Sequence, residues 1–253
     1  MTSLVHAEVL KLRTTRSTGW LLLATLAMEA LMVAFNIPKR GDQEALVPLD
    51  DPGLLAATMG TGLVISQVLV TVFGVMACTQ EYRYGTITSA YLVEPRRPRI
   101  LFAKLVAATL VSAVVVVATL ILVVPPSIIL IGSRDGEAAL GAQFWQVVGV
   151  GFVVLAASAA IGVALGAVVR HQIAAVVGVL VWMTAVEHVV IPALPALGRW
   201  MPGGATLSVL QQGRASGLDG DLLPPAVGGL VLLAYAAMAI TLAVVVTPRR
   251  DVV

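Results

Sequence analysis

Residues 105–131 read LVAATLVSAVVVVATLILVVPPSIILI, and no charged residue interrupts the chain between Lys104 and Arg134. A hydrocarbon core of about 30 Å needs about 20 apolar residues in a helix, so this stretch is long enough to cross a membrane. A proline removes a backbone donor and clashes with the preceding turn. We therefore predict a membrane-spanning helix with a kink near one end, at Pro125 and Pro126.

Five further apolar runs lie on either side of this stretch. They are Ser17–Ile37, Leu54–Cys78, Phe144–Val169, Gln172–Ile191 and Leu222–Val246. The composition agrees, with 58% hydrophobic and 12% charged residues against about 25% charged residues in soluble domains. The fourth and fifth spans are joined only at Arg170-His171-Gln172, which predicts a tight helical hairpin. We predict an all-α, polytopic membrane protein with six transmembrane helices in a single domain, residues 1–253.

The first apolar run has a second interpretation as a signal peptide, with Lys11, Arg13 and Arg16 as its basic region. We favour a retained helix, because Glu29 lies inside the apolar run and the basic region is long.

Basic residues are distributed unevenly over the two sides that six crossings define. Eleven of the 16 lie on the side of the N-terminus, namely Lys11, Arg13, Arg16, Arg83, Arg96, Arg97, Arg99, Lys104, Arg170, Arg249 and Arg250. The other side holds Lys39, Arg40, Arg134, Arg199 and Arg214, together with most of the acidic residues outside the spans. Cytoplasmic loops carry an excess of Lys and Arg. We therefore expect a plasma (inner) membrane protein with both termini and the 80–104 loop in the cytosol.

Two segments outside the spans are apolar enough to contact the membrane. In residues 1–16, Val5, Val9 and Leu12 share one helical face, which predicts an amphipathic surface helix whose basic residues face anionic lipid. The alternative is a frayed basic terminus that serves only topology. Residues 192–222 contain several prolines and glycines among apolar residues, and we expect this outer segment to be re-entrant.

Small residues recur every four positions on two spans, at Ser158, Gly162 and Gly166 and again at Ala174 and Gly178. Small residues allow helix backbones to approach closely. We expect these contacts within one chain, although contacts between two copies would produce the same pattern.

The 80–104 loop is the most densely charged segment between two spans. Residues 80–92 have few helix breakers besides Gly85, so they either extend the second span or form a short surface helix. Pro95 and Pro98 then predict a turn before the third span. A solvated basic turn that only enforces topology is the alternative. The pattern of Glu, Gly-Thr and two prolines favours a surface shaped for a partner.

The same loop resembles the cytosolic loop of ABC type-2 transporter permeases, the membrane subunits of ABC exporters. The matching positions are Glu81, Gly85, Thr86, Pro95, Arg99 and Lys104. The family usually has Gly-Lys at the last position, and this chain has Ala103 before its lysine. The order of surface helix, six spans and a long outer segment before the last span is also similar to the family.

The resemblance implies a coupling helix that sits in a groove of a separate cytosolic ABC ATPase subunit, and a second permease copy or homologue. The expected contact residues are Glu81, Arg83, Gly85, Thr86, Pro95 and Arg99. A phosphate-binding loop needs Gly-Lys-Ser/Thr, and the three lysines here follow Leu10, Pro38 and Ala103. We therefore expect no cofactor in this chain, with ATP and Mg bound by the partner ATPase.

Enzymatic and nucleic-acid functions have little support. His6, His171 and His188 are separated by the predicted topology and cannot form a His-x-x-x-His metal pair, and no Gly-x-Ser-x-Gly motif is present. The single cysteine, Cys78, excludes an internal disulfide. We predict no catalytic residue, no metal site and no nucleic-acid partner.

Ionisable residues inside membrane spans are functional candidates by default. Glu29 lies in the first span, and Glu187 and His188 lie near the outer end of the fifth. They belong either to a substrate path or to structural and interfacial contacts. We predict an ATP-driven export permease of unidentified substrate. The competing functions are a secondary transporter that uses these carboxylates and a membrane immunity or sensor protein without transport.

Overall fold

The computed structural model describes residues 1–42, 45–212 and 222–249, and helices make up most of them. In chain order the helices are α1 (Thr2–Thr14), α2 (Arg16–Asn36), α3 (Leu54–Arg83), α4 (Ile87–Val93), α5 (Arg97–Leu122), α6 (Val124–Ser133), α7 (Ala142–Val169), α8 (Gln172–Leu180), the π-helix η1 (Val181–Val186), α9 (Glu187–Ala193), α10 (Pro195–Gly198), α11 (Pro202–Val209) and α12 (Pro225–Arg249). They form six spans long and apolar enough to cross a membrane, which confirms the six predicted spans.

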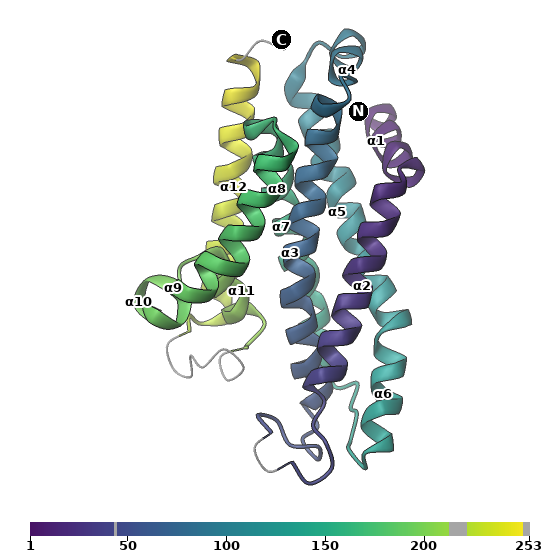
Figure 1. Ribbon diagram of the computed structural model, residues 1–253, viewed down its shortest axis with the longest axis vertical. Coiled ribbons are helices and arrows are strands. Elements are labelled where there is room, and N and C mark those ends of the chain that lie inside the picture. Colours follow the sequence, from purple (N-terminus) through teal and green to yellow (C-terminus); the bar gives the residue numbers. More distant parts are fainter. Residues whose placement is uncertain (43–44, 213–221, 250–253) are drawn as a thin grey trace.

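The long helices run side by side along the longest axis of the molecule (Figure 1). α3 and α7 form the central pair and contact each other over most of their length. α2 and α8 pack against α3, whereas α5 and α12 pack against α7. The N-terminus, α4 and the C-terminal end of α12 lie at one end, which we name the α4 end (Figure 1).

The central pair is close-packed because glycines remove the side chains between the two backbones. A Cβ added at Gly162 would collide with the carbonyl of Thr71, and one at Gly74 would collide with the carbonyl of Ala159. A Cβ at Gly166 would lie 2.7 Å from the carbonyl of Val75. The small residues of the fourth span therefore pack within the chain, as expected.

The fifth span gives the opposite result for the same spacing. A Cβ at Gly178 would meet nothing within 4 Å, and Ala174 is exposed. The residues of α8 that are buried are instead Ala175 and Val179. The small residues of the fifth span thus do not mediate close helix packing within the chain.

Two interruptions divide the third and fifth spans. The third breaks at Val123, between α5 and α6, with Pro125 in the first turn of α6, which confirms the predicted kink. A first-turn proline is tolerated because its missing N–H has no helical partner there. The fifth span contains the π-helix η1, which no sequence pattern had indicated.

The hairpin between the fourth and fifth spans is as short as predicted. Arg170 has a left-handed backbone (φ 59°) and ends α7. His171 then begins α8 by accepting a hydrogen bond on Nδ1 from the backbone N–H of Ala174 at 3.1 Å. This N-cap satisfies one of the unpaired donors at the start of the helix.

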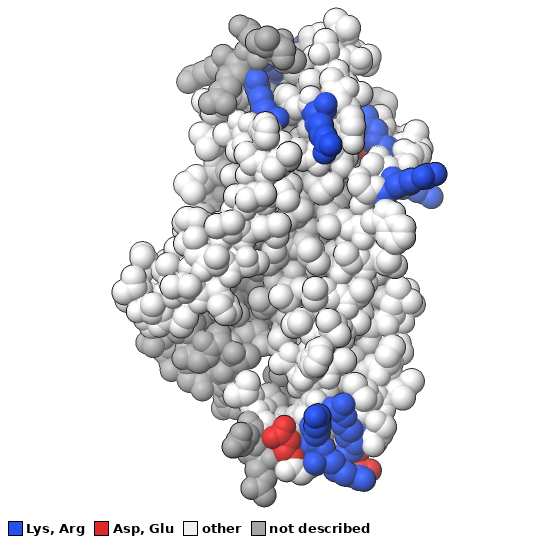
Figure 2. Space-filling model, in the orientation of Figure 1, with Lys and Arg blue, Asp and Glu red and all other residues white. Residues whose placement is uncertain are grey.

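The charged groups lie at the two ends of the long axis, and the middle of the visible face is almost free of them (Figure 2). Between the fifth and sixth spans, α10 and α11 are short helices within the segment that we expect to be re-entrant. Residues 213–221 of the predicted 192–222 segment lie outside the described residues, as do Glu44, Arg214 and Arg250. Arg83, Arg97 and Arg99 belong to the ends of α3 and α5 that flank α4, so they lie at the α4 end.

Candidate functional site

Four charged side chains form an ion cluster at the α4 end. Lys104 Nζ lies 2.8 Å from a carboxylate oxygen of Glu8 and 2.8 Å from one of Glu81. Lys11 Nζ lies 2.6 Å from Glu8 and 2.8 Å from Glu81. Each lysine therefore bridges both glutamates. We name Glu8, Lys11, Glu81 and Lys104 the ion cluster.

The ion cluster connects three helices. Glu8 and Lys11 belong to α1, Glu81 to the last turn of α3 and Lys104 to the second turn of α5. Lys104 also donates to the carbonyl of Ala77 at 3.2 Å, and its side chain is only 3% exposed. Removing one member of such a cluster leaves a charge without its partner away from water.

Lys11 is the most accessible member of the ion cluster. Burial disfavours its charge, but the hydrogen bonds and charges of Glu8 and Glu81 outweigh that effect and raise the pKa of Lys11 above its ordinary value. The residue of α1 that is buried is Glu8, whereas Val5, Val9 and Leu12 are half-buried. Ionic contacts therefore attach α1 to the rest of the chain, in addition to any apolar face.

The predicted partner-contact residues occupy different environments. Glu81 is buried in the ion cluster. Arg83 is exposed and donates to Gln172 Oε1 at 3.3 Å, which links the end of α3 to the start of α8. Gly85 has φ +69°, a conformation that strongly favours glycine, and makes the turn into α4. Thr86 is exposed immediately before α4.

The chain leaves the helical conformation at residues 94–96, which include the exposed Pro95. Pro98 lies in the first turn of α5 and not in the turn, so the prediction was right for Pro95 only. Arg99 pairs with Glu94 at 3.4 Å on the surface. The backbone N–H of Arg96 and the guanidinium of Arg99 lower the pKa of Glu94. Pairs of this exposed kind contribute little to stability.

Sequence reasoning did not select the apolar surface of α4. Leu92 is 81% exposed, Val93 is 83% exposed and Tyr84, just before α4, is 69% exposed. Tyr82 and Tyr91 hydroxyls lie 3.3 Å apart and hold α4 against the end of α3. The available signal was an apolar pair inside a loop already predicted to lie outside the membrane.

Two arginines at the α4 end hold the last turn of α12. Arg97 donates to the carbonyl of Thr247 at 3.0 Å, and Arg170 donates to the same carbonyl at 3.2 Å. Cations at a helix C-terminus neutralise its unpaired carbonyls. Arg97 also lies over the ring of Tyr91, and Arg170 over the ring of Tyr82. α12 is thus attached to the same region as α4.

Glu29 of the first span is fully enclosed. Its Oε2 accepts hydrogen bonds from Ser66 on α3 at 3.0 Å and from Thr119 on α5 at 2.9 Å. Its exposed fraction is 0%. A Cβ at Gly62 of α3 would lie 2.8 Å from the Glu29 side chain, so that side chain fills the space between the helices. This carboxyl group joins α2, α3 and α5.

Glu187 of the fifth span, in contrast, lines a cavity. This cavity, which we name the inner cavity, has a volume of about 570 Å³ and lies between α3, α7, α8 with η1, the α10–α11 segment and α12. It opens to the surface beside the exposed Trp182 and Trp200. Glu187 Oε1 accepts a hydrogen bond from Trp182 Nε1 at 2.9 Å. His188 is exposed and does not line the cavity. Glu29 and Glu187 therefore do not share a site, and His188 does not line the cavity that Glu187 lines.

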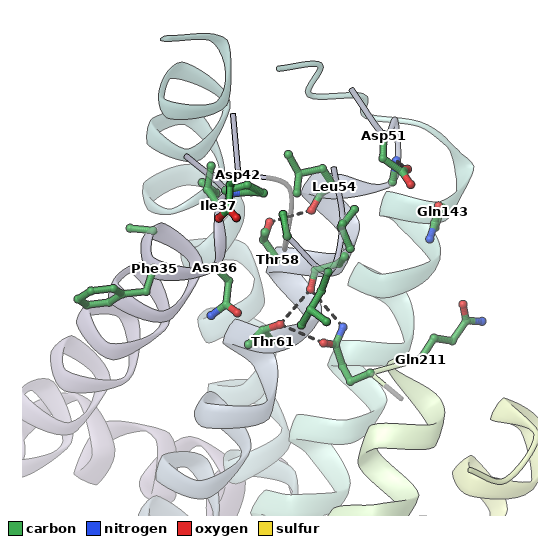
Figure 3. Close-up of a pocket in the computed structure, with 18 of the residues that line it drawn as sticks. Phe35, Asn36, Ile37, Asp42, Asp51, Leu54, Thr58, Thr61, Gln143 and Gln211 are labelled. Carbon is green, nitrogen blue, oxygen red and sulfur yellow. Dashed lines mark hydrogen bonds between the residues drawn. The ribbon is translucent and has the colours of Figure 1, made fainter. Parts of the chain in front are cut away.

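A larger cavity of about 1140 Å³ lies at the end opposite α4, among the ends of α2, α3 and α11 (Figure 3). Thr61 donates to Gln212 Oε1 at 3.0 Å, and Gln212 donates to the carbonyl of Ala57 at 3.1 Å. These bonds attach the end of α11 to α3. The polar side chains around this cavity include Asn36, Asp51 and Gln211.

Six apolar helical spans with charged groups at both ends define the class, a multi-pass membrane protein. The family model described as "ABC-2 family transporter protein" matches residues 4–186, which is well over half of the chain. The chain belongs to this family and is a membrane permease. None of the curated proteins compared with it matches.

Proposed function

We propose that this chain is the membrane subunit of an ATP-driven exporter, and that α4 receives a separate cytosolic ABC ATPase. The observation that supports this most is the exposure of Leu92 and Val93 on a short helix outside the six spans, in a member of the ABC-2 family. Exposed apolar side chains that cluster at one place are typical of protein contacts. The ATPase would bind the ATP and Mg, and this chain would supply the path.

The orientation follows from the charge distribution. In the predicted topology, eleven of the 16 basic residues lie on the side of the 80–104 loop, which contains α4. The positive-inside rule then assigns the α4 end and both termini to the cytosolic face of the plasma membrane. We expect a cysteine at Arg96, in a Cys78→Ser background, to resist an impermeant thiol reagent in intact cells. A cysteine at Asp50 should react. The reverse pattern would overturn the orientation and the docking proposal with it.

Direct contacts connect α4 to the membrane spans. Gly85 and the Tyr82–Tyr91 contact connect α4 to α3. The ion cluster then connects the end of α3 to α1 and α5. Movement of the ATPase on α4 would therefore displace three helices together rather than one loop. We propose that this displacement switches the path from inward-facing to outward-facing.

We also propose that two membrane subunits work together, because one chain supplies six spans and closed two-fold assembly is the commonest symmetry. The second subunit is a copy of this chain or a homologue, and the substrate path lies between the two. Mass measurement of the complex in lipid should give two membrane subunits and two ATPases. A fully active complex with one of each would contradict this.

The docking proposal is tested by placing a charge on the apolar surface of α4. Leu92→Asp and Val93→Asp should each reduce recovery of the ATPase with the purified chain by tenfold or more, because a charge would be buried without a partner at the contact. Leu46→Asp, the same change at an exposed leucine of the end opposite α4, is the matched control and should retain the ATPase. Equal recovery for all three variants would refute docking through these residues.

A further inference from the structure

The inner cavity combines an apolar wall with one carboxylate. Its volume of about 570 Å³ lies within the range of roughly 300–1,000 Å³ that small-molecule pockets have. Side chains such as Leu165, Trp182 and Tyr235 line it, and the described lining residues include no lysine, arginine or histidine. Glu187 is the one acidic residue among them. The described wall of the cavity therefore carries one acidic group and no basic group.

The surroundings of Glu187 suit a carboxylate that accepts hydrogen bonds only. Trp182 Nε1 donates to one oxygen at 2.9 Å, and the backbone of Gly203 lies close to the other oxygen. A side chain at position 203 would collide with Glu187 Oε2, so the glycine permits this close approach. Trp182 contacts the carboxylate as a donor, and an ionised carboxylate has no hydrogen of its own to donate. A positive group in the cavity would complete its surroundings.

A second polar group in the cavity wall lacks a partner. Ser158 of α7 is 1% exposed, lines the cavity, and its hydroxyl has no hydrogen-bond partner among the described residues. A buried polar group without a partner is costly unless a ligand or water satisfies it. Glu187 and Ser158 therefore give the cavity two places at which a bound molecule gains polar contacts.

The π-helix brings the aromatic wall to the carboxylate. η1 covers Val181–Val186 and contains Trp182, and Glu187 follows it directly. π-helical turns are rare and occur frequently at functional sites. Trp200, which lies between α10 and α11, lines the same cavity. Aromatic faces attract cations, which adds to the attraction of the carboxylate.

We propose that the inner cavity binds a lipophilic organic cation, with its positive centre at the Glu187 carboxylate and its apolar body against Trp182, Leu165 and Tyr235. The further step, that such cations are the class of molecule exported, rests on the proposed function. Binding itself does not. It can therefore be measured on the purified chain without an ATPase.

The probes are two ions of the same shape and opposite charge, tetraphenylphosphonium and tetraphenylborate. Each is titrated separately into the full-length chain in detergent by calorimetry. We expect saturable binding of the cation at least tenfold tighter than that of the anion. Glu187→Gln should weaken cation binding at least tenfold and leave the anion within about threefold, a difference that corresponds to about 1.4 kcal/mol per tenfold change.

Two variants keep the test decisive if Glu187→Gln is poorly folded. His188→Gln changes the exposed neighbour of Glu187 and should bind the cation as the wild type does. Gly178→Leu adds a side chain where a Cβ meets nothing within 4 Å, at the cavity wall, and should weaken binding of both ions. Equal binding of the two ions, or tight cation binding by Gly178→Leu, would overturn the proposal. Cation binding with no effect on ATP hydrolysis would instead count against the exported class alone.

Discussion

The α3–α7 pair and the fifth span use the same kinds of residue and reach opposite structures. In the apolar windows of α3 and α7, 61% and 56% of residues are buried, against 17% in the fifth span. Gly162 lies directly against the backbone of α3, whereas Gly178 faces open space. Glu29 is enclosed between three helices, whereas Glu187 lines a cavity.

This difference teaches that small residues and intramembrane carboxylates have no fixed role. Their role depends on whether they face a neighbouring helix or a cavity. The covered pair, α3 and α7, forms a firm centre, and the uncovered fifth span with its π-helix offers a surface for a ligand or another subunit. We expect substitutions in the first region to change stability and matched substitutions in the second to change binding.

The largest effect is expected for Gly162→Leu. Its side chain would occupy the space of the Thr71 carbonyl, so α3 and α7 would have to separate, at a cost of about 3 kcal/mol or more. Gly178→Leu, the matched change in the fifth span, should alter stability by about 1 kcal/mol or less. Thermal unfolding in detergent measures both. Similar losses in the two variants would refute the contrast between the regions.

The next effect is expected at the ion cluster. Lys104→Met removes the buried cation and leaves Glu8 and Glu81 with Lys11 alone. Because Lys11 still contacts both glutamates, the change should cost about 3 kcal/mol. Arg99→Ala, which removes an exposed pair, should cost about 1 kcal/mol or less.

A double variant sharpens this prediction. Lys104→Met combined with Glu81→Met removes one charge of each sign, and should recover much of the stability lost by Lys104→Met alone. Chemical or thermal unfolding of Lys104→Met, Glu81→Met and the double variant gives the comparison. If the double variant loses more stability than Lys104→Met and Glu81→Met lose when their separate losses are added, the cluster does not act through charge balance.

A smaller effect is expected when the two intramembrane carboxyl groups are converted to amides. Glu29→Gln keeps the shape and most hydrogen bonding to Ser66 and Thr119, so stability should fall by about 1 kcal/mol and export should remain dependent on ATP. Glu187→Gln should leave stability within a similar margin and weaken cation binding. Export that collapses in a well-assembled Glu29→Gln complex, and that a proton gradient alone drives in the wild type, would favour a secondary transporter.

The smallest effect on global stability is expected at the turn before α4. Gly85→Ala places a Cβ on a backbone with φ +69°, which costs about 1–2 kcal/mol locally but meets no neighbouring atom within 4 Å. We expect global unfolding to change little and α4 to be displaced, so ATPase recovery should fall two- to fivefold. Unchanged recovery would show that the geometry of this turn does not control docking.

Local features were predictable from the sequence. The length of apolar runs gave six spans, Pro125 located the break in the third, and the three residues at Arg170 gave the hairpin. Each of these depends on nearby residues alone. The boundaries differ mainly where a helix continues past the apolar run, as α3 does to Arg83.

Features that depend on distant residues were not predictable. Glu81 and Lys104 belong to the same motif, but their pairing with Glu8 and Lys11 arises only when α1 packs beside α5. The π-helix has no signal of the kind that apolar periodicity or proline provides, and Trp182 within it contacts Glu187 directly after it. The apolar pair Leu92 and Val93 is visible in the sequence, but the sequence does not indicate that both side chains are exposed.

The ion cluster also restricts how this chain can diverge. Its four positions carry two positive and two negative charges, and each lysine contacts both glutamates. A charge reversal at any single position leaves like charges together away from water, so that intermediate would be selected against. Exchange of charge in relatives should therefore involve Glu8, Lys11, Glu81 and Lys104 in compensating pairs. The four positions would then change together in evolution, although they lie up to 96 residues apart in the chain.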